Sequence, residues 1–233
     1  MPTDVSALDL ILRADPVLLA IVKLSLIVSL SAVICAALIG IPLGALIALT
    51  KFRGRNGVIV VLNALMGLPP VVVGLMVYLL LSRSGPLGGL GILFTPAAMI
   101  VAQTILVAPI IAALSRQTIE DLWVEYRDEL DAMNVGPLQR IATLIIDARF
   151  SLVTALLAGF GRAAAEVGAV IIVGGNIDGF TRVMTTTIAL ETSKGDLPLA
   201  LALGLVLLAV VAVLNALLGL ARRGQGSALA GVR

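Results

Sequence analysis

GRAAAEVGAVIIVGGNI, residues 161–177, is an apolar stretch that carries two opposite charges, Arg162 and Glu166, one helical turn apart. An arginine or aspartate at the centre of a membrane span costs about 2.5–3.5 kcal/mol, whereas each large aliphatic residue returns only about 0.3–0.6 kcal/mol. A lipid-facing helix with both charges would therefore have little net stability in a bilayer. We expect the pair to face protein or water, and ionisable residues inside a membrane are candidates for function.

The rest of the chain has the composition of an integral membrane protein. Of its 233 residues, 60% are apolar and 13% are charged, and the mean hydropathy is +1.13. A helix needs about 20 apolar residues to cross the hydrocarbon core of a bilayer. The sequence therefore predicts an all-α membrane protein with five transmembrane helices in a single domain, residues 1–233. The five predicted spans are residues 24–49, 58–81, 96–114, 152–175 and 199–220.

The sequence offers few residues for metal or redox chemistry. It has no histidine and a single cysteine, Cys35, inside the first span. Metal sites need several such ligands, so we expect no metal site and no intrachain disulfide. The G-x-x-x-x-G-K-[ST] loop that binds nucleotide phosphates is also missing from the sequence. We expect neither a catalytic residue nor a bound cofactor on this chain.

Basic residues indicate how the chain crosses the membrane, because short loops rich in lysine and arginine stay on the cytoplasmic side. Ten of the sixteen basic residues follow the first span, separate the third from the fourth, or follow the fifth. With an odd number of spans, these three segments share one side. The sequence predicts an amino terminus outside the cell and a carboxyl terminus in the cytoplasm.

The cytoplasmic segment between the third and fourth spans, residues 116–149, has a helical pattern. Its apolar residues recur at helical spacing between acidic ones. The first helix should end near Asn134, because Gly136 can adopt the left-handed conformation that ends helices and Pro137 suits the first turn of the next helix. We predict a helical hairpin at the cytoplasmic face, which either docks a soluble partner or lies at the membrane interface without one.

This segment resembles the cytoplasmic EAA loop of binding-protein-dependent ABC importer permeases, in which a Glu-Ala-Ala triplet precedes a glycine. When that glycine is aligned with Gly136, the triplet falls on Leu130, Asp131 and Ala132. The acidic residue is thus displaced by one position, with Glu129 and Asp131 on either side of the expected place. The usual Ile-x-Leu-Pro ending of the loop is also replaced.

Two further stretches support the resemblance. GLPPVVVGLMVYLLLSRSGPLG, residues 67–88, is similar to the second helix of molybdate and sulfate permeases. Residues 161–177 resemble the GEFGA-type segment of the same proteins. The EVGAV and VGGNI forms found here, followed by TRVMTTTIALETSKGDLPLA, are more similar to tungstate-uptake permeases. The resemblance covers roughly residues 20–215.

The resemblance implies a multi-pass protein of the cell membrane with the MetI-like permease fold and cytoplasmic coupling helices. It implies a homodimer, two ABC ATPase subunits that bind ATP and magnesium, and an extracytoplasmic solute-binding protein. The chain would not be an enzyme by itself. The residues that the resemblance assigns to ATPase coupling are Glu129, Asp131, Ala132 and Gly136.

Two features inside the membrane are candidates for the substrate pathway. Arg162 and Glu166 either line an anion path or form a self-neutralised pair that only locks helix packing, and both interpretations stay open. Pro69 and Pro70 should kink or break the second span, because proline removes a backbone donor. If they break it, a helix begins at membrane depth and its positive end favours an anion; the alternative is a plain kink.

The segment after the fourth span, residues 174–196, should lie on the outer side of the membrane. It offers side chains that donate hydrogen bonds to an oxyanion. These side chains are Asn176, Arg182, Thr185, Thr186 and Thr187. The alternative is an ordinary solvated loop.

Small residues at a spacing of four predict close contacts between helices. One such row lies in the first span and comprises Ala36, Gly40, Gly44 and Ala48. A second row comprises Gly161, Ala165 and Ala169.

The sequence therefore predicts the permease subunit of an ATP-driven importer for an oxyanion, tungstate first, with molybdate or sulfate as alternatives. Two other classes stay open. One is a secondary ion carrier that uses Arg162 and Glu166 as an ion relay and needs no ATPase. The other is a membrane scaffold whose cytoplasmic hairpin only recruits a partner.

Overall fold

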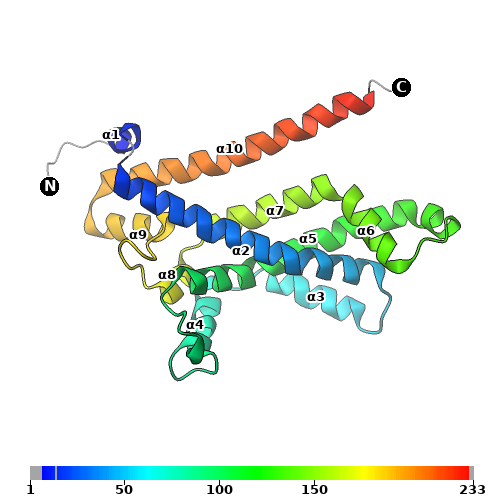
Figure 1. The fold of residues 1–233 in the computed structure, drawn as a ribbon, viewed down its shortest axis with the longest axis horizontal. Helices are drawn as coiled ribbons and strands as arrows, with labels where there is room; N and C mark the ends of the chain where they lie inside the picture. The colour runs from blue at the N-terminus through cyan, green and yellow to red at the C-terminus, as the bar shows by residue number, and fades with distance from the viewer. Residues whose placement is uncertain (1–6, 14, 231–233) are drawn as a thin grey trace. The chain divides into compact units, whose positions relative to one another are not determined.

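The structure is a computed structural model that describes residues 7–13 and 15–230, and within these ranges it contains helices and turns but no strand. The prediction of an all-α protein is confirmed. The helices are labelled in Figure 1. The chain divides into two compact units, which we describe separately. Unit 1 comprises Met1–Ala32, Pro69–Gln103 and Gly161–Arg233, and unit 2 comprises Val33–Leu68 and Thr104–Phe160.

Within the described residues, three helices are long and apolar enough to cross a membrane, and the number rises to five if each of two interrupted helix pairs counts as one span. The three are α2 (Pro16–Leu49), α5 (Pro96–Ala132) and the part Leu197–Ala216 of α10 (Leu197–Ala230). Helix α2 begins earlier than the predicted residue 24. It does so because Asp15 Oδ1 accepts the N–H groups of Val17 and Leu18, at 2.9 and 3.1 Å, and so caps the helix.

Helix α5 differs from the prediction, because the third span and the first half of the cytoplasmic hairpin form one helix. Its 37 residues correspond to about 55 Å at 1.5 Å per residue, well beyond a hydrocarbon core of about 30 Å. The predicted boundary near residue 115 marks a change from apolar to charged residues. Neither glycine nor proline lies there to interrupt the backbone hydrogen bonds, so the helix continues to Ala132.

The second predicted span is broken, as expected for Pro69 and Pro70. Helix α3 (Arg55–Leu65) ends before the two prolines, and α4 (Pro70–Leu81) begins with Pro70 at its first position. Proline has no N–H and a φ suited to the first helical turn, so it begins the second helix without loss. The predicted break is confirmed, and the alternative of a plain kink is wrong.

The fourth predicted span, residues 152–175, is not one helix. Helix α7 (Arg149–Ala164) ends before Glu166, and the short helix α8 (Gly168–Gly174) follows. The row Gly161, Ala165 and Ala169 therefore does not lie along one helix face, and that prediction is wrong. The remaining elements are α1 (Ala7–Leu12), the 3-10 turn η1 (Gly88–Leu90), α6 (Pro137–Asp147) and α9 (Met184–Lys194).

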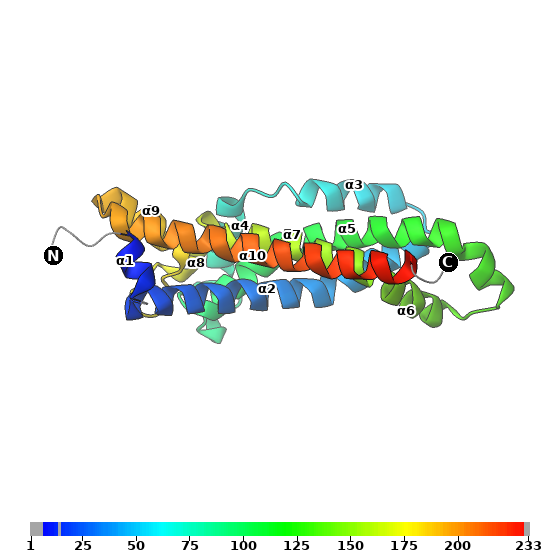
Figure 2. The same ribbon diagram turned by 90° about the horizontal axis from the view of Figure 1, so that it is seen from above.

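In unit 2, helices α2 and α5 approach closely at the predicted row of small residues. A Cβ atom added to Gly44 would lie 2.6 Å from the carbonyl oxygen of Ala112, and one added to Gly40 would lie 3.0 Å from that of Ala108. The small-residue prediction is confirmed for this row. Helix α3 runs alongside α5 in both views (Figures 1 and 2) and packs Leu62 against Ala112 and Ala113.

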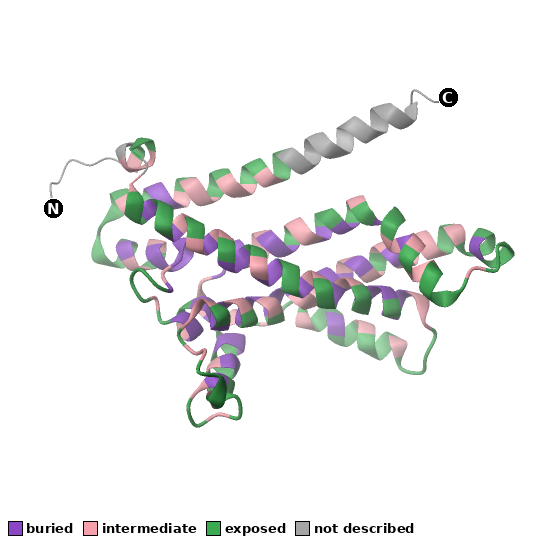
Figure 3. Ribbon diagram, in the orientation of Figure 1, coloured by how far each residue is buried: buried purple, intermediate pink, exposed green. Residues whose placement is uncertain are grey.

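In unit 1, helix α1 lies beside the first turns of α10, and α9 packs against α10 as well (Figure 1). The core of this region joins Leu18 and Ile21 of α2 to Met184, Ala202 and Leu203. Helix α10 exposes many side chains along its described length (Figure 3). Only 17% of the most apolar 18-residue stretch of α10 is buried, compared with 56% for that of α5. Helix α10 therefore has a large apolar surface available for lipid or another chain.

Candidate functional site

The break between α7 and α8 brings the two intramembrane charges together. Arg162 lies in the last turn of α7, and its Nη1 is 2.7 Å from Oε2 of Glu166. The Glu166 side chain is 3% exposed, whereas that of Arg162 is 31% exposed. The carboxylate is therefore enclosed by protein, whereas the arginine side chain is partly exposed.

The second carboxylate oxygen explains why α8 begins where it does. Oε1 of Glu166 accepts the backbone N–H of Ala169 at 3.0 Å and so satisfies one of the free donors at the start of α8. The backbone carbonyl of Glu166 accepts the hydroxyl of Thr185 at 2.7 Å. Glu166 thus holds the broken segment through both its side chain and its backbone.

The start of α4 lies beside the start of α8, so the structure brings the Pro69–Pro70 segment near Glu166. A Cβ on Gly168 would lie 2.8 Å from Cγ2 of Val71 and 3.6 Å from Oε1 of Glu166. A Cβ on Gly74 would lie 2.7 Å from Cα of Ala169. These glycines let the two helices touch along their backbones.

Helix α4 offers few backbone donors at its start. Pro69 and Pro70 have no N–H, and the N–H groups of Val72 and Val73 both donate to the carbonyl of Pro69, at 3.1 and 3.2 Å. Val71 is left as the first-turn residue whose N–H could meet a ligand. The positive end of the helix is present, but it is a weaker anion site than a helix with several free N–H groups.

The three consecutive threonines lie in the first turns of α9 and are buried, with exposed fractions of 8% or less. Thr185 donates to Glu166, whereas Thr186 and Thr187 donate to the carbonyl of Val183 at 3.1 and 2.7 Å. The alternative of a solvated loop is therefore wrong for these residues. Each hydroxyl proton already has a backbone acceptor.

Asn176 and Arg182 have other contacts than the Arg162–Glu166 pair. Asn176 follows the carboxyl end of α8, about 10 Å from the start of that seven-residue helix. It has a φ of 49°, and its Oδ1 is buried without a hydrogen-bond partner. Arg182 pairs with Asp178 at 3.0 Å and lines a cavity of about 530 Å³ with residues from the start of α2. The ion-pair partner of Arg182 is thus Asp178, and Arg162 pairs with Glu166.

Gln103 of α5 is a site residue that the sequence analysis missed. Its side chain is 3% exposed, and its Nε2 donates to the carbonyl of Ala163 at 3.0 Å, at the end of α7. Its Oε1 is buried without a partner. The available signal was an amide in the middle of the apolar run PAAMIVAQTILVAPIIAAL, residues 96–114.

Of the residues predicted to couple to an ATPase, three lie in the last turn of α5 (Glu129, Asp131 and Ala132) and Gly136 directly precedes α6; all four are exposed. The predicted conformation of Gly136 is wrong. Asn134 takes the left-handed conformation, with φ 52°, and Gly136 is extended, with φ −68° and ψ 157°. The following Pro137 accounts for this, because proline pushes the preceding residue out of the helical region.

Asp131 of the same group is paired within the chain. Its Oδ1 lies 2.7 Å from Nη1 of Arg140, a residue of α6 that the sequence analysis did not single out. The acidic residue that is displaced in the EAA-like loop is therefore part of the hairpin's own structure.

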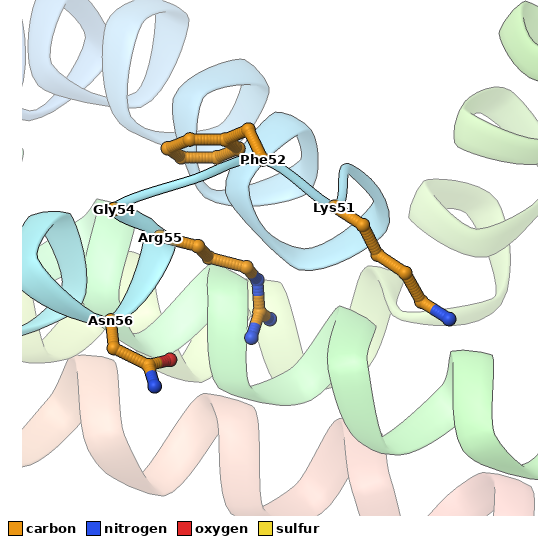
Figure 4. Close-up of a pocket in the computed structure, with 5 residues that line it drawn as sticks. All are labelled: Lys51, Phe52, Gly54, Arg55 and Asn56. Atoms are coloured by element: carbon orange, nitrogen blue, oxygen red, sulfur yellow. The ribbon is translucent and has the colours of Figure 1, made fainter.

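A second cluster of charges lies where α2 passes into α3. Glu120 of α5 binds both Arg55, at 2.8 Å, and Arg116, and Nε of Arg55 donates to the carbonyl of Ile47 at 2.8 Å. A hollow of about 290 Å³ borders this loop, and Figure 4 shows the Arg55 side chain extending away from Phe52. Because Arg55 is held by these contacts, the cluster fastens the loop to α5.

The site's chemistry is that of ion pairing and hydrogen bonding. Among the residues that the structure describes, no group of three or more histidine, cysteine, aspartate or glutamate side chains is placed to hold a metal ion. The Arg162–Glu166 pair, the start of α4 and the amide of Gln103 surround a break in the membrane-embedded helices. The partly exposed Arg162 can donate hydrogen bonds to an anion through its guanidinium, whereas the free atom of the Gln103 amide, Oε1, can only accept.

Comparison with known proteins shows the family of the chain. A model of the family described as "Binding-protein-dependent transport system inner membrane component" matches residues 40–225. A probable anion ABC transporter permease protein of Haloferax volcanii is 45% identical, over 86% of this chain and 88% of its own.

Two relatives carry the name tungstate uptake system permease protein TupB. The protein from Peptoclostridium acidaminophilum is 42% identical, over 91% of this chain and 93% of its own. The protein from Campylobacter jejuni is 37% identical, over 90% of this chain and 87% of its own. The family model spans well over half of the sequence, and these relatives align along nearly all of it. The chain therefore belongs to the inner membrane components of binding-protein-dependent transport systems.

Proposed function

We propose that the chain is the permease subunit of an ATP-driven importer for tungstate. The observation that carries this proposal is the relationship to two tungstate uptake permeases along about nine tenths of the chain. Molybdate and sulfate are the alternatives within the class, because they are oxyanions of the same shape and charge. Size and basicity separate them, and the experiment below compares them directly.

The geometry at the α7–α8 break supports passage of an anion. The Arg162 side chain is partly exposed, and a guanidinium donates two parallel hydrogen bonds to an oxyanion. An unpaired arginine in a low-dielectric site would hold a dianion tightly. Glu166 at 2.7 Å reduces that attraction, and transport requires a site that binds weakly enough to release its ion.

We propose that all the residues predicted from the sequence for the substrate pathway take part in it, each in its own role. Arg162 contacts the anion, Glu166 moderates the charge, and Pro69 and Pro70 set the start of α4 beside them. Thr185, Thr186 and Thr187 position backbone carbonyls, as their hydrogen bonds indicate. Asn176 lies at the other end of α8, where its Nδ2 group can donate to the anion and its buried Oδ1, which has no partner, can accept from a water.

The proposed assembly has two copies of this chain and two ATPase subunits. ATP and magnesium bind to the ATPase subunits, and this chain holds no cofactor. The hairpin of α5 and α6, with Glu129, Asp131, Ala132 and Gly136 at its turn, docks on an ATPase subunit. A solute-binding protein delivers the anion from outside.

The proposed topology has five spans, an outer amino terminus and a cytoplasmic carboxyl terminus, with residues 1–233 acting as one permease domain. Helices α2, α5 and α7 contribute residues to both compact units, which supports a single domain. The basic residues beside the spans support the orientation. Labelling of single cysteines, introduced at Ser6 and Ser227 in a Cys35→Ala background, with a membrane-impermeant reagent tests it: only the amino-terminal label should react from outside.

The test of the function is uptake by vesicles that contain the permease, its ATPase and its binding protein, with tungstate, molybdate and sulfate compared at equal concentration. We expect ATP-dependent tungstate uptake that exceeds uptake of the other two. A preference for molybdate or sulfate would reassign the substrate within the class. Uptake by the permease alone, driven by a proton gradient, would support a secondary carrier. If no solute is taken up, the result would support a membrane scaffold that only recruits a partner.

A further inference from the structure

Arg140 makes three contacts that join both helices of the hairpin to the turn between them. Its Nη1 lies 2.7 Å from Oδ1 of Asp131 in α5, and its Nε donates to the carbonyl of Val135 in the turn at 2.7 Å. Its guanidinium carbon lies 5.5 Å from the ring centre of Trp123. One side chain of α6 thus contacts α5 at two places and the turn at a third.

The turn needs these contacts because few apolar residues hold it. Leu130 and Leu144 are buried in the core of unit 2, with Val135 packed beside them. At the turn itself, Met133 and Leu138 are 73% and 83% exposed. The N–H of Val135 bonds to the carbonyl of Leu130, but its own carbonyl lies beyond the end of α5. Arg140 supplies the donor for that carbonyl, which an end of helix otherwise leaves to solvent.

The charge and the planar shape of the Arg140 guanidinium both contribute to these contacts. The Arg140 side chain is 26% exposed, and Asp131 is 56% exposed. A simple ion pair at this exposure is weak, but a guanidinium that also bonds a carbonyl and stacks on an indole is held in one geometry. Lysine cannot reproduce the planar fork.

We propose that Arg140 is a positioning residue for energy coupling, and that Asp131 serves it as an internal anchor instead of meeting the ATPase subunit. Arg140 fixes the turn so that exposed Met133 and Leu138 enter the partner in one orientation. Glu129 is then the acidic residue of the loop that faces the partner. This inference rests on the proposed docking of the hairpin on an ATPase and adds which residues shape the docked surface.

The test compares Arg140→Lys and Arg140→Met with the matched control Arg127→Met. Arg127 lies on α5 of the same hairpin and forms only an exposed pair with Asp128 at 3.2 Å. The first measurement is hydrogen exchange of the amides of residues 133–136 in the purified permease. Both Arg140 variants should raise the exchange rate about tenfold, since a charge-assisted hydrogen bond is lost, and Arg127→Met should not change it.

The second measurement is tungstate uptake per ATP hydrolysed in assembled complexes that contain equal amounts of permease and ATPase. Both Arg140 variants should assemble and still hydrolyse ATP, but the amount of tungstate taken up per ATP hydrolysed should fall about tenfold. A purely structural role would lower the yield of folded permease and leave this ratio unchanged. That result, or unchanged amide exchange, would overturn the proposal.

Asp131→Asn separates an internal anchor from a partner contact. If Asp131 acts through Arg140, the double variant with Arg140→Met should lose no more coupling than Arg140→Met alone. Additive losses would show that Asp131 meets the partner and would overturn its assignment. The exchange measurement needs no substrate, so it tests Arg140 even if the wild-type complex fails to take up tungstate.

Discussion

The hydroxyl of Thr185 donates a 2.7 Å hydrogen bond to the backbone carbonyl of Glu166, and it thereby ties the first turn of α9 to the break between α7 and α8. Both residues are buried. The bond supplies a donor to a carbonyl in a segment that has left the helix, where no intrahelical partner follows. The break is therefore held by a residue 19 positions away in the chain.

Thr185→Val should lower the free energy of unfolding by about 1–3 kcal/mol, because it keeps the shape of the side chain and leaves a buried carbonyl without its donor. Thr187→Val is the matched control. Its hydroxyl bonds to the carbonyl of Val183, which also accepts the N–H of Thr187 at 2.9 Å, so the loss should stay below about 1 kcal/mol. Thermal unfolding in detergent measures both, and equal losses would contradict the special role of Thr185.

Removing the intramembrane charges should have unequal effects on stability. Arg162→Leu leaves a carboxylate that is 3% exposed without its partner and should cost about 3 kcal/mol. Glu166→Leu leaves an arginine that is 31% exposed and can reach water, so its cost should be smaller, about 1–2 kcal/mol, mainly for the lost cap on Ala169. Glu166→Gln keeps an acceptor for that N–H and is the control.

The double variant Arg162→Leu with Glu166→Leu separates packing from transport. It has no unpaired charge, so it should be more stable than Arg162→Leu alone. It should also fail to take up tungstate, because the anion would lose the guanidinium. A double variant that is stable and fully active would leave the pair with a packing role only.

Gly74 and Gly161 should respond oppositely to alanine. A Cβ on Gly74 would lie 2.7 Å from Cα of Ala169, a backbone atom that cannot rotate away. Gly74→Ala should therefore force α4 and α8 apart and cost about 1–3 kcal/mol. Gly161 has open space around its Cβ position within α7, so Gly161→Ala should raise stability by about 0.5–1 kcal/mol. Melting temperatures of the purified variants measure both effects. A stabilised Gly74→Ala variant would show that α4 and α8 do not meet as described.

Asn134 and Gly136 should differ in the same way at the hairpin turn. Asn134→Val places a β-branched residue at φ 52° and should cost about 1–2 kcal/mol, while Asn134→Gly should be neutral or better. Gly136→Val places the same side chain at φ −68° and ψ 157°, with no atom near its Cβ, and should leave stability unchanged. Binding of the ATPase subunit to Gly136→Val then reports only on contact with the partner. A large loss of stability in Gly136→Val would contradict the extended conformation.

Much of the helical architecture follows from local chemistry that a sequence displays. Long apolar runs require helices in a bilayer, so the cores of α2, α5 and α10 were predicted. Proline acts on its own backbone and on the preceding turn, so the break before Pro70 was predicted too. The row from Ala36 to Ala48 was read correctly because the spacing of small residues along one unbroken helix is itself the signal.

The contacts at the site join residues that are distant in the sequence. Such contacts are defined only once the chain has folded. No proline marks the end of α7; the helix stops where Glu166 caps α8 and Thr185 of α9 bonds its carbonyl. Gly74 and Ala169 touch because two broken helices lie side by side. Periodicity could predict that Arg162 and Glu166 would meet, since they are four positions apart in the sequence. It could not predict that Asp131 would pair with Arg140, because that contact exists only after the chain has turned at Asn134.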